Sequence, residues 1–283
     1  MSEGTTSGAG GAGATAPPRR VRVHHLRQAK AEGRRLTMLT AYDAVTARLF
    51  DEAGLDLLLV GDSIGNTMHG HATTLPVTLD ELVVAARSVA GATRRALVVA
   101  DLPFGSYEAG PAQALASGVR MLKEAGVAAV KIEGGTRIVP QVEALTGAGV
   151  PVVGHLGFTP QSEHLLGGPR VQGRGQEAAD RLTADALALQ EAGAVAVVLE
   201  MVPAPVAARV TEVLEVPTIG IGAGAACDGQ VLVWTDMAGM TGWSPRFARR
   251  FGEVGAALTA AAEAYAAAVR DGGFPGPEHT FER

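Results

Sequence analysis

The chain has 283 residues, of which 47% are hydrophobic and 19% charged, a balance that suits a folded protein with a sizeable core. Aromatic residues make up only 4% and the formal net charge is −5, so neither base stacking nor electrostatics indicates a nucleic-acid partner. No uninterrupted apolar run approaches the roughly 18 residues that a membrane-spanning helix needs, so we do not expect a membrane protein.

The first 20 residues differ in composition from the rest of the chain. They are rich in Gly, Ala, Ser and Thr, and they lack the apolar stretch of a secretory signal. We therefore expect a disordered tail over residues 1–20 and a single folded domain over residues 21–283. The only cysteine, Cys227, excludes an intrachain disulfide and favours a reducing compartment, so we expect the cytoplasm as the location.

Eight short apolar runs rich in β-branched residues follow one another along the chain. Most are nearly continuous rather than alternating, which is the pattern of parallel strands covered on both faces. The predicted strands are residues 36–42, 56–63, 96–103, 128–134, 151–157, 194–202, 217–224 and 231–237.

Stretches with helix signals separate these runs. Thr78 and Glu81 form the pattern of a capping box at the start of one helix. Further helices are expected over residues 111–124, which begin with proline, over 177–191, and over 246–270 at the end of the domain.

Eight strands in β-α alternation over roughly 250 residues match the size and rhythm of a (βα)8 TIM barrel. A doubly wound open sheet is the competing α/β architecture. The count of eight, and the polar residues at the end of nearly every strand, favour the barrel. We therefore predict one catalytic barrel domain.

Polar residues end most of the predicted strands, where the active site of such a barrel forms. Charged groups that follow four or more apolar residues are costly to bury unless they are paired or ligated. Lys131 and Glu133 are two residues apart on one strand, so both should project to the same side, over the barrel mouth. In chain order these strand-end residues are Tyr42, Asp43, Asp62, Ser63, Asp101, Lys131, Glu133, His155 and Glu200.

Carboxylates from three separate strands, Asp62, Asp101 and Glu133, could hold a divalent metal with positions left open for substrate. Oxygen ligands without clustered Cys or His suit Mg²⁺ better than Zn²⁺. Each acid taken alone could equally be a helix cap or an ion-pair partner. All of them together with Glu200 favour a reaction centre.

Four other features have simpler explanations. Asp43 precedes a helical stretch and is predicted to cap it. His155 could be a ligand, an acid–base group or a packed side chain, and the sequence leaves this open. The glycines of residues 220–224 could cradle a phosphate or allow close approach of any ligand. Cys227 has no His in view, so a catalytic thiol is not expected.

At these residues the sequence resembles the ketopantoate hydroxymethyltransferase family, from about residue 21 to the C-terminal EHTF. So many motifs in the same order are far more specific than any one of them. The motifs are TAYD (40–43), VGDSIGNTMHGH (60–71), TLPVT (74–78), ADLPFGSY (100–107), VKIEGG (130–135), GHLGFTPQS (154–162), VQGRG (171–175), LE (199–200) and IGIGAG (219–224).

The resemblance implies a barrel of the phosphoenolpyruvate/pyruvate-like type that transfers a hydroxymethyl group from 5,10-methylenetetrahydrofolate to 3-methyl-2-oxobutanoate. The product would be 2-dehydropantoate, on the route to pantothenate and coenzyme A. It further implies one Mg²⁺ per subunit and a homo-oligomer, typically a decamer. The implied metal ligands are Asp62, Asp101 and Glu133, the implied oxoacid-binding residues are Asp62, Ser63, Asp101 and Lys131, and the implied base is Glu200.

Three alternatives remain open at this point. A metal-dependent oxoacid lyase or aldolase on the same barrel would share the metal site but need no folate. Lys131 could instead act as a Schiff-base nucleophile, although the three nearby acids should keep its ammonium group protonated. A non-catalytic metabolite-binding barrel would bind the oxoacid without exchanging the proton at its C3.

Overall fold

The computed structural model describes residues 19–281, in which eight parallel strands close into a barrel with β8 paired to β1. This confirms the predicted architecture, and the predicted N-terminal tail lies almost wholly outside the described residues. The strands are β1 (Leu36–Thr40), β2 (Leu57–Val60), β3 (Leu97–Asp101), β4 (Ala129–Glu133), β5 (Val152–Gly157), β6 (Ala196–Glu200), β7 (Thr218–Ile221) and β8 (Gly229–Leu232).

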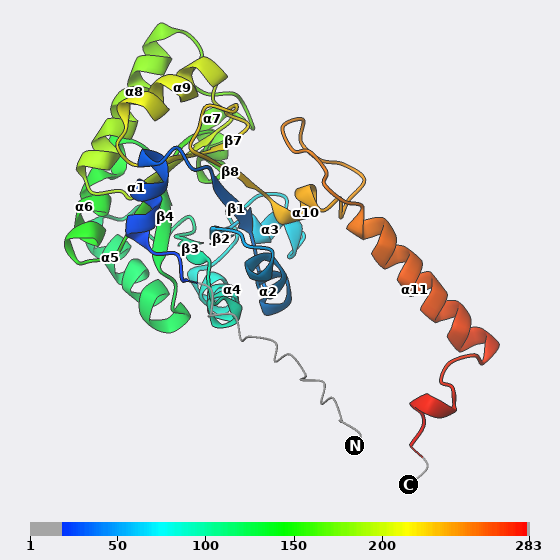
Figure 1. Ribbon diagram of the computed structural model, residues 1–283. Coiled ribbons are helices and arrows are strands. Elements are labelled where there is room, and N and C mark those ends of the chain that lie inside the picture. Colours follow the sequence, from blue (N-terminus) through cyan, green and yellow to red (C-terminus); the bar gives the residue numbers. More distant parts are fainter. Residues whose placement is uncertain (1–18, 282–283) are drawn as a thin grey trace, which may run out of the picture.

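Helices surround the barrel, and neighbouring ones pack against each other, as α2 does with α4, α5 with α6, and α8 with α9 (Figure 1). No helix within residues 19–281 combines the length and apolarity needed to cross a membrane. The helices are α1 (Val23–Ala31), α2 (Ala44–Glu52), α3 (Ile64–Thr67), α4 (Leu79–Ala92), α5 (Pro111–Arg120), α6 (Val139–Gly147), α7 (Glu163–Leu166), α8 (Gln176–Glu191), α9 (Ala204–Val213), α10 (Trp234–Met237) and α11 (Val254–Asp271).

Two predicted helix caps are present. The Asp43 carboxylate accepts hydrogen bonds from the backbone amides of Val45 and Thr46, at 2.7 and 3.0 Å. It therefore caps α2 by pairing amides that have no partner within the helix. Thr78 and Glu81 form the reciprocal capping box of α4, in which the Thr78 amide donates to Glu81 at 2.7 Å. Both acids are therefore structural, as the sequence indicates.

Strand alternation divides the core into two parts. On β3, Leu97 and Val99 belong to a cluster that fills the barrel interior, whereas Val98 and Ala100 belong to the cluster between strands and helices. The same alternation runs through the other strands because successive side chains point to opposite faces. At the strand ends, the side chains that point inward therefore reach the barrel mouth.

The predicted eighth strand over residues 231–237 is wrong: β8 runs from Gly229 to Leu232, and Trp234–Met237 form the short helix α10. Pairing with β1 decides this register, because Leu36 lies opposite Gly229 and Leu39 opposite Leu232. A Cβ at Gly229 would lie 2.6 Å from the Leu36 carbonyl oxygen, so only glycine fits this start.

The last helix is also shorter at its start than predicted. It begins at Val254 rather than near residue 246, because residues 241–252 run in turns and irregular structure over the barrel mouth. Figure 1 shows α11 (orange to red) running away from the barrel. None of its residues is buried, and Leu258 and Tyr265 are 60% and 62% exposed.

Candidate active site

Five titratable side chains occupy inward-facing positions at the ends of their strands. Asp101 continues the inward series of β3, Lys131 and Glu133 that of β4, His155 that of β5 and Glu200 that of β6. Inter-strand register then brings neighbours together: Asp101 lies opposite Lys131 and Glu133 opposite His155. The prediction that Lys131 and Glu133 point to one side is confirmed.

Asp62 and Ser63 also lie at the barrel mouth, although they belong to a turn and not to a strand. They follow β2 in a turn, and Gly61 occupies the inward position just before them. A Cβ at Gly61 would lie 2.8 Å from Ser63 Oγ and 3.4 Å from Asp101 Oδ2, so a larger residue there would push these two side chains away. The Asp62 amide donates to Asp101 Oδ2 at 3.0 Å and ties the two strand ends together.

Lys131 lies at the centre of the charged groups. Its Nζ is 3.1 Å from Asp101 Oδ1, 3.6 Å from Glu133 Oε1 and 3.2 Å from His155 Nδ1. His155 in turn lies between two acids, with Nδ1 3.1 Å from Glu133 Oε1 and Nε2 3.3 Å from Glu200 Oε2. The contact with Glu200 is an ion-pair distance without hydrogen-bond alignment.

Burial and mutual repulsion shift the pKa values of the acids in different directions. Desolvation, followed by the charges of Asp101 and Glu133, raises the pKa of Asp62 well above its ordinary range. Desolvation also raises the pKa of Asp101, although Lys131 opposes the shift. Burial would raise the pKa of Glu133 as well, but its contacts with His155 and Lys131 outweigh burial and lower it.

The two basic groups remain charged in this setting. Desolvation works against the Lys131 ammonium, yet Asp101 and Glu133 raise its pKa above the ordinary value. For His155 desolvation and the Lys131 charge are likewise outweighed by Glu133 and Glu200, which raise the pKa to about 9. An imidazolium can donate from Nδ1 to Glu133, while its Nε2 lies at ion-pair distance from Glu200.

Gln161 is a site residue that the sequence interpretation did not single out. Its side-chain amide donates to Asp62 Oδ2 at 2.8 Å and to the Leu102 carbonyl at 3.0 Å, while its backbone amide donates to Glu133 Oε2 at 3.0 Å. The Tyr107 hydroxyl donates to its side-chain oxygen. The only sequence signal was its place within the motif at 154–162, because an uncharged residue after a strand end has no distinctive pattern.

Tyr42, one of the predicted strand-end residues, supports Ser63. The buried Tyr42 hydroxyl lies 2.8 Å from Ser63 Oγ, so it sets the direction in which the serine hydroxyl can donate. The pKa of Tyr42 is raised, first by desolvation, so the phenol stays neutral and remains a hydrogen-bond partner.

Asp62, Asp101 and Glu133 are only 3%, 2% and 1% exposed, and their oxygens are the donor type that hard divalent cations prefer. Within residues 19–281 no three His, Cys, Asp or Glu side chains stand at mutual metal-binding distances. Lys131 Nζ is instead the cation between Asp101 and Glu133. Asp101 Oδ1 is buried, and its 3.1 Å contact with Lys131 Nζ is an ion pair without hydrogen-bond alignment.

A cavity of about 470 Å³ opens above these residues, and its two sides differ. We call the ends of β2–β5 the acidic half; it carries Asp62, Asp101, Lys131, Glu133 and His155. We call the side formed by β6–β8, β1 and residues 233–247 the apolar half, with Glu200 at the border. Its lining includes Val198, Ile221, Val231, Val233, Trp243, Pro245 and Phe247.

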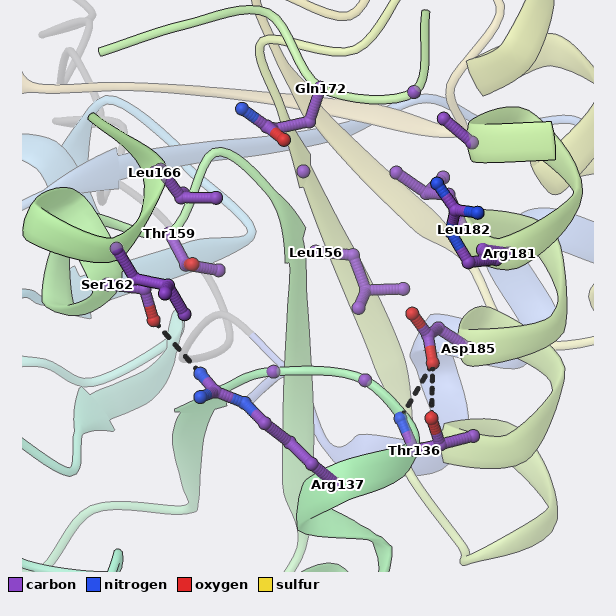
Figure 2. A pocket seen from close by; sticks show the side chains of 16 residues that line it. Thr136, Arg137, Leu156, Thr159, Ser162, Leu166, Gln172, Arg181, Leu182 and Asp185 are labelled. Atoms are coloured by element: carbon purple, nitrogen blue, oxygen red, sulfur yellow. Dashed lines mark hydrogen bonds between the residues drawn. The ribbon is translucent and has the colours of Figure 1, made fainter. Parts of the chain in front are cut away.

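A second hollow of about 370 Å³ lies beside the ends of β4 and β5 (Figure 2). Two pairs of its polar residues bond to each other: the Asp185 carboxylate accepts from the amide and hydroxyl of Thr136, and Arg137 donates to Ser162. This hollow holds none of the acidic half, so the reactive groups gather in the larger cavity.

The glycines of residues 220–224 allow close packing. A Cβ at Gly220 would lie 3.0 Å from Cys227 Sγ, one at Gly222 3.0 Å from the Phe247 ring and one at Gly224 2.6 Å from Ala204 Cβ. Cys227 itself is fully buried in the layer between strands and helices, and burial raises the pKa of its thiol. Both observations agree with a structural role for this region.

Solved structures with the same architecture include a phosphoenolpyruvate phosphomutase from Streptomyces platensis subsp. rosaceus, with a TM-score of 0.61 and 19% identity over 89% of this chain and 88% of that one. A 2,3-dimethylmalate lyase of the PEP mutase/isocitrate lyase superfamily gives 0.58 and 21% identity over 93% of both chains. At these identities the likeness concerns the fold alone.

Sequence relatives are much more similar. The chain is 60% identical to 3-methyl-2-oxobutanoate hydroxymethyltransferase of Saccharopolyspora erythraea, over 93% of this chain and 90% of the relative, and 55% identical to that of Mycobacterium bovis, over 99% and 100%. A sequence model of the family described as ketopantoate hydroxymethyltransferase matches residues 20–277. The chain therefore belongs to the ketopantoate hydroxymethyltransferase family.

Proposed function

We propose that this protein transfers a hydroxymethyl group from 5,10-methylenetetrahydrofolate to 3-methyl-2-oxobutanoate, forming 2-dehydropantoate for pantothenate synthesis. One observation carries the proposal: in a member of this family, three buried acids, a buried lysine and Glu200 line a single cavity. The reaction consumes one water, which supplies the hydroxyl oxygen, and releases tetrahydrofolate. It needs a proton removed from C3 of the oxoacid and stabilisation of the negative charge that remains. The cavity holds groups for both tasks.

We propose that Asp62, Asp101 and Glu133 hold one Mg²⁺ per subunit. Three buried carboxylates outnumber the two buried cations, Lys131 and the His155 imidazolium. Desolvation and, after it, the charges of Asp101 and Glu133 raise the pKa of Asp62, as expected for crowded acids that lack a further cation. Asp101 Oδ1 contacts Lys131 as an ion pair without hydrogen-bond alignment, which leaves a lone pair that a metal ion could take. When bound, the metal acts as a Lewis acid that stabilises charge developing on the oxoacid oxygens.

The oxoacid lies over Asp62 and Asp101 in this proposal, with two residues orienting it. Ser63, held by Tyr42, donates its hydroxyl hydrogen to the anionic substrate. Lys131 is buried and protonated, so its ammonium group offsets the charge that develops on the 2-oxo oxygen. Because both groups are positioned before substrate arrives, they cost little reorganisation during the reaction.

Glu200 accepts the proton from C3. It stands at the border of the two halves, where Val198 and Ile221 supply an apolar surface for the branched end of the oxoacid. His155 Nε2, 3.3 Å from Glu200 Oε2, orients the carboxylate. Holding the enolate next to the folate carbon then lowers the barrier by orientation, a contribution of roughly 7–11 kcal/mol in favourable cases.

The alternatives fit less well. A Schiff-base nucleophile must be a neutral amine, whereas Asp101 and Glu133 keep Lys131 protonated. The names of the similar relatives favour the transferase over a folate-independent lyase. A merely binding protein has no need of a carboxylate placed beside a buried histidine at the substrate's reactive end.

We propose that the protein is a homo-oligomer, and the family resemblance suggests a decamer. An interface between subunits explains why apolar residues of α11 are exposed in the single chain. Val254, Leu258, Tyr265 and Val269 are spaced on one helix face, and each is at least 46% exposed. A second copy of the chain is the occupant we propose for this face. The buried thiol of Cys227 is compatible with the cytoplasm as the location.

The experiment follows deuterium exchange at C3 of 3-methyl-2-oxobutanoate, and then product formation with and without methylenetetrahydrofolate. We expect exchange without folate and product only with it. Glu200→Gln should lower both rates by at least about 100-fold while oxoacid binding persists, whereas the exposed Glu212→Gln should change neither. Product formation without folate would overturn the proposal.

A further inference from the structure

The apolar half of the cavity is larger than an oxoacid of this size requires. The five-carbon oxoacid is held by the acidic half, whereas β7, β8 and residues 233–247 contribute a separate surface. Trp243, 73% exposed, and Phe247, 36% exposed, present aromatic rings there together with Pro245. Large aromatic surfaces left exposed beside a cavity indicate a ligand with flat faces.

Asp236 is the only carboxylate that α10 brings into this surface. It lines the cavity, is partly buried, and its side chain has no hydrogen bond or ion pair with any residue from 19 to 281. The nearby cation Arg250 is engaged elsewhere, donating to the Thr241 carbonyl at 2.7 Å and lying 3.4 Å from Glu253. A partly buried carboxylate without a partner is costly, and N–H donors from a ligand would remove that cost.

The position of Asp236 is set by the backbone. The Trp234 amide donates to Thr40 Oγ1 at 3.0 Å, which anchors the start of α10 to the end of β1. The Asp236 amide donates to the Val233 carbonyl at 3.1 Å. The carboxylate is therefore presented from a short helix fastened to two strands, and not from a free loop.

The co-substrate offers the matching chemistry. The pterin ring of a reduced folate is flat and carries two adjacent donors, the ring N3–H and the 2-amino group, which together fit both oxygens of one carboxylate. We propose, on the basis of the proposed function, that Asp236 accepts these two hydrogen bonds and that Trp243 and Phe247 cover the ring. Apolar residues of β7 and β8 then support its other face, and the reactive carbon lies toward Glu200.

The hollow in Figure 2 is a poorer place for the pterin. Its carboxylate, Asp185, already accepts from Thr136, and its Arg137 side chain already donates to Ser162. It contributes no aromatic side chain to its lining. An unpaired acceptor next to exposed aromatic rings occurs in the apolar half of the main cavity.

The test measures the KM for methylenetetrahydrofolate and, separately, folate-independent exchange at C3. Asp236→Asn keeps the size of the side chain but sets an amide against the two ligand donors. We expect the KM to rise by roughly 10-fold or more, with C3 exchange within about twofold of the wild type. The surface variant Asp80→Asn should leave both unchanged.

A folate analogue that lacks the 2-amino group sharpens the test, because it removes one of the two proposed bonds from the ligand side. The wild type should discriminate against this analogue, and Asp236→Asn should lose most of that discrimination. Trp243→Leu, at an exposed position, should also raise the folate KM and serves if Asp236→Asn does not fold. An unchanged KM in both variants, with normal exchange, would overturn the inference; absence of exchange in the wild type would instead defeat the proposed function.

Discussion

The acidic half and the apolar half of the barrel mouth are built on the same scaffold and stabilised by different forces. Both consist of inward-facing strand ends, yet β2–β5 present ion pairs and hydrogen bonds while β7 and β8 present aliphatic surface. Charge interactions strengthen where water is excluded, so the apolar half increases the effect of the acidic half. The difference is the basis of our proposal that the acidic half, with Glu200 at its border, performs the chemistry while the apolar half binds and shields.

Removal of the divalent cation should give the largest effect, because it affects the acidic half as a whole. We expect a chelator to abolish C3 exchange and Mg²⁺ to restore it. The raised pKa of Asp62 means that the metal-free protein favours the protonated carboxyl, a stabilisation present at low pH and lost as pH rises through the folded-state pKa. The rise in thermal midpoint on adding Mg²⁺ should therefore be larger at pH 8 than at pH 5.

This comparison uses calorimetry with and without Mg²⁺ at each pH. If the increase in thermal midpoint were the same at both values, protons and metal would not compete for the acidic half.

Lys131→Met should lower the exchange rate by about 100- to 1,000-fold, since it deletes the charge that offsets the developing enolate. Methionine preserves much of the apolar stem, so the loss reports charge more than packing. Lys123→Met, at an exposed position on the π-helical turn Met121–Ala125, is the matched control. Steady-state exchange kinetics measure both, and near-normal exchange in Lys131→Met would remove the lysine from the mechanism.

Gln161→Leu should weaken Mg²⁺ binding by roughly 10- to 100-fold, because it removes the donor that orients Asp62. Titration of the metal-free protein with Mg²⁺, followed calorimetrically, measures the change. The exposed Gln176→Leu should bind the metal like the wild type. Equal affinities for both variants would mean that the Asp62 orientation does not depend on Gln161.

Ile221→Val tests the apolar half by deleting one methylene group next to the cavity. We expect the free energy of unfolding to fall by about 0.5–1.5 kcal/mol and C3 exchange to stay within a few-fold. Denaturant unfolding and exchange assays on the same preparation check this. A loss of exchange as large as that of Lys131→Met would erase the distinction between the two halves.

Thr78→Ala should have the smallest effect on activity, because the α4 capping box lies outside both halves. It should cost about 1 kcal/mol of stability and leave exchange unchanged. The backbone and side-chain hydrogen bonds from Thr78 lower the pKa of Glu81, so its contribution is present at neutral pH and lost as pH falls through the folded-state pKa. The stability difference between wild type and variant should therefore shrink in acid, as measured by urea unfolding at pH 7 and pH 3.

Local sequence patterns determined much of this protein. Continuous apolar runs identified strands covered on both faces, and a spacing of two residues placed Lys131 and Glu133 on one side because strand alternation is a local property. Asp43 and Thr78 were recognisable as caps for the same reason, since their partners lie within three residues.

Tertiary structure decided what depends on partners far away in the chain. Pairing with β1 set the limits of β8 and turned residues 234–237 into helix. Gln161 acquired its role from Asp62, 99 residues away, and His155 came to lie between Glu133 and Glu200 through the register of three strands. The sequence identified Asp62, Asp101 and Glu133 as acids at strand ends. Their charge balance, and the apolar half that faces them, arise only when the barrel closes.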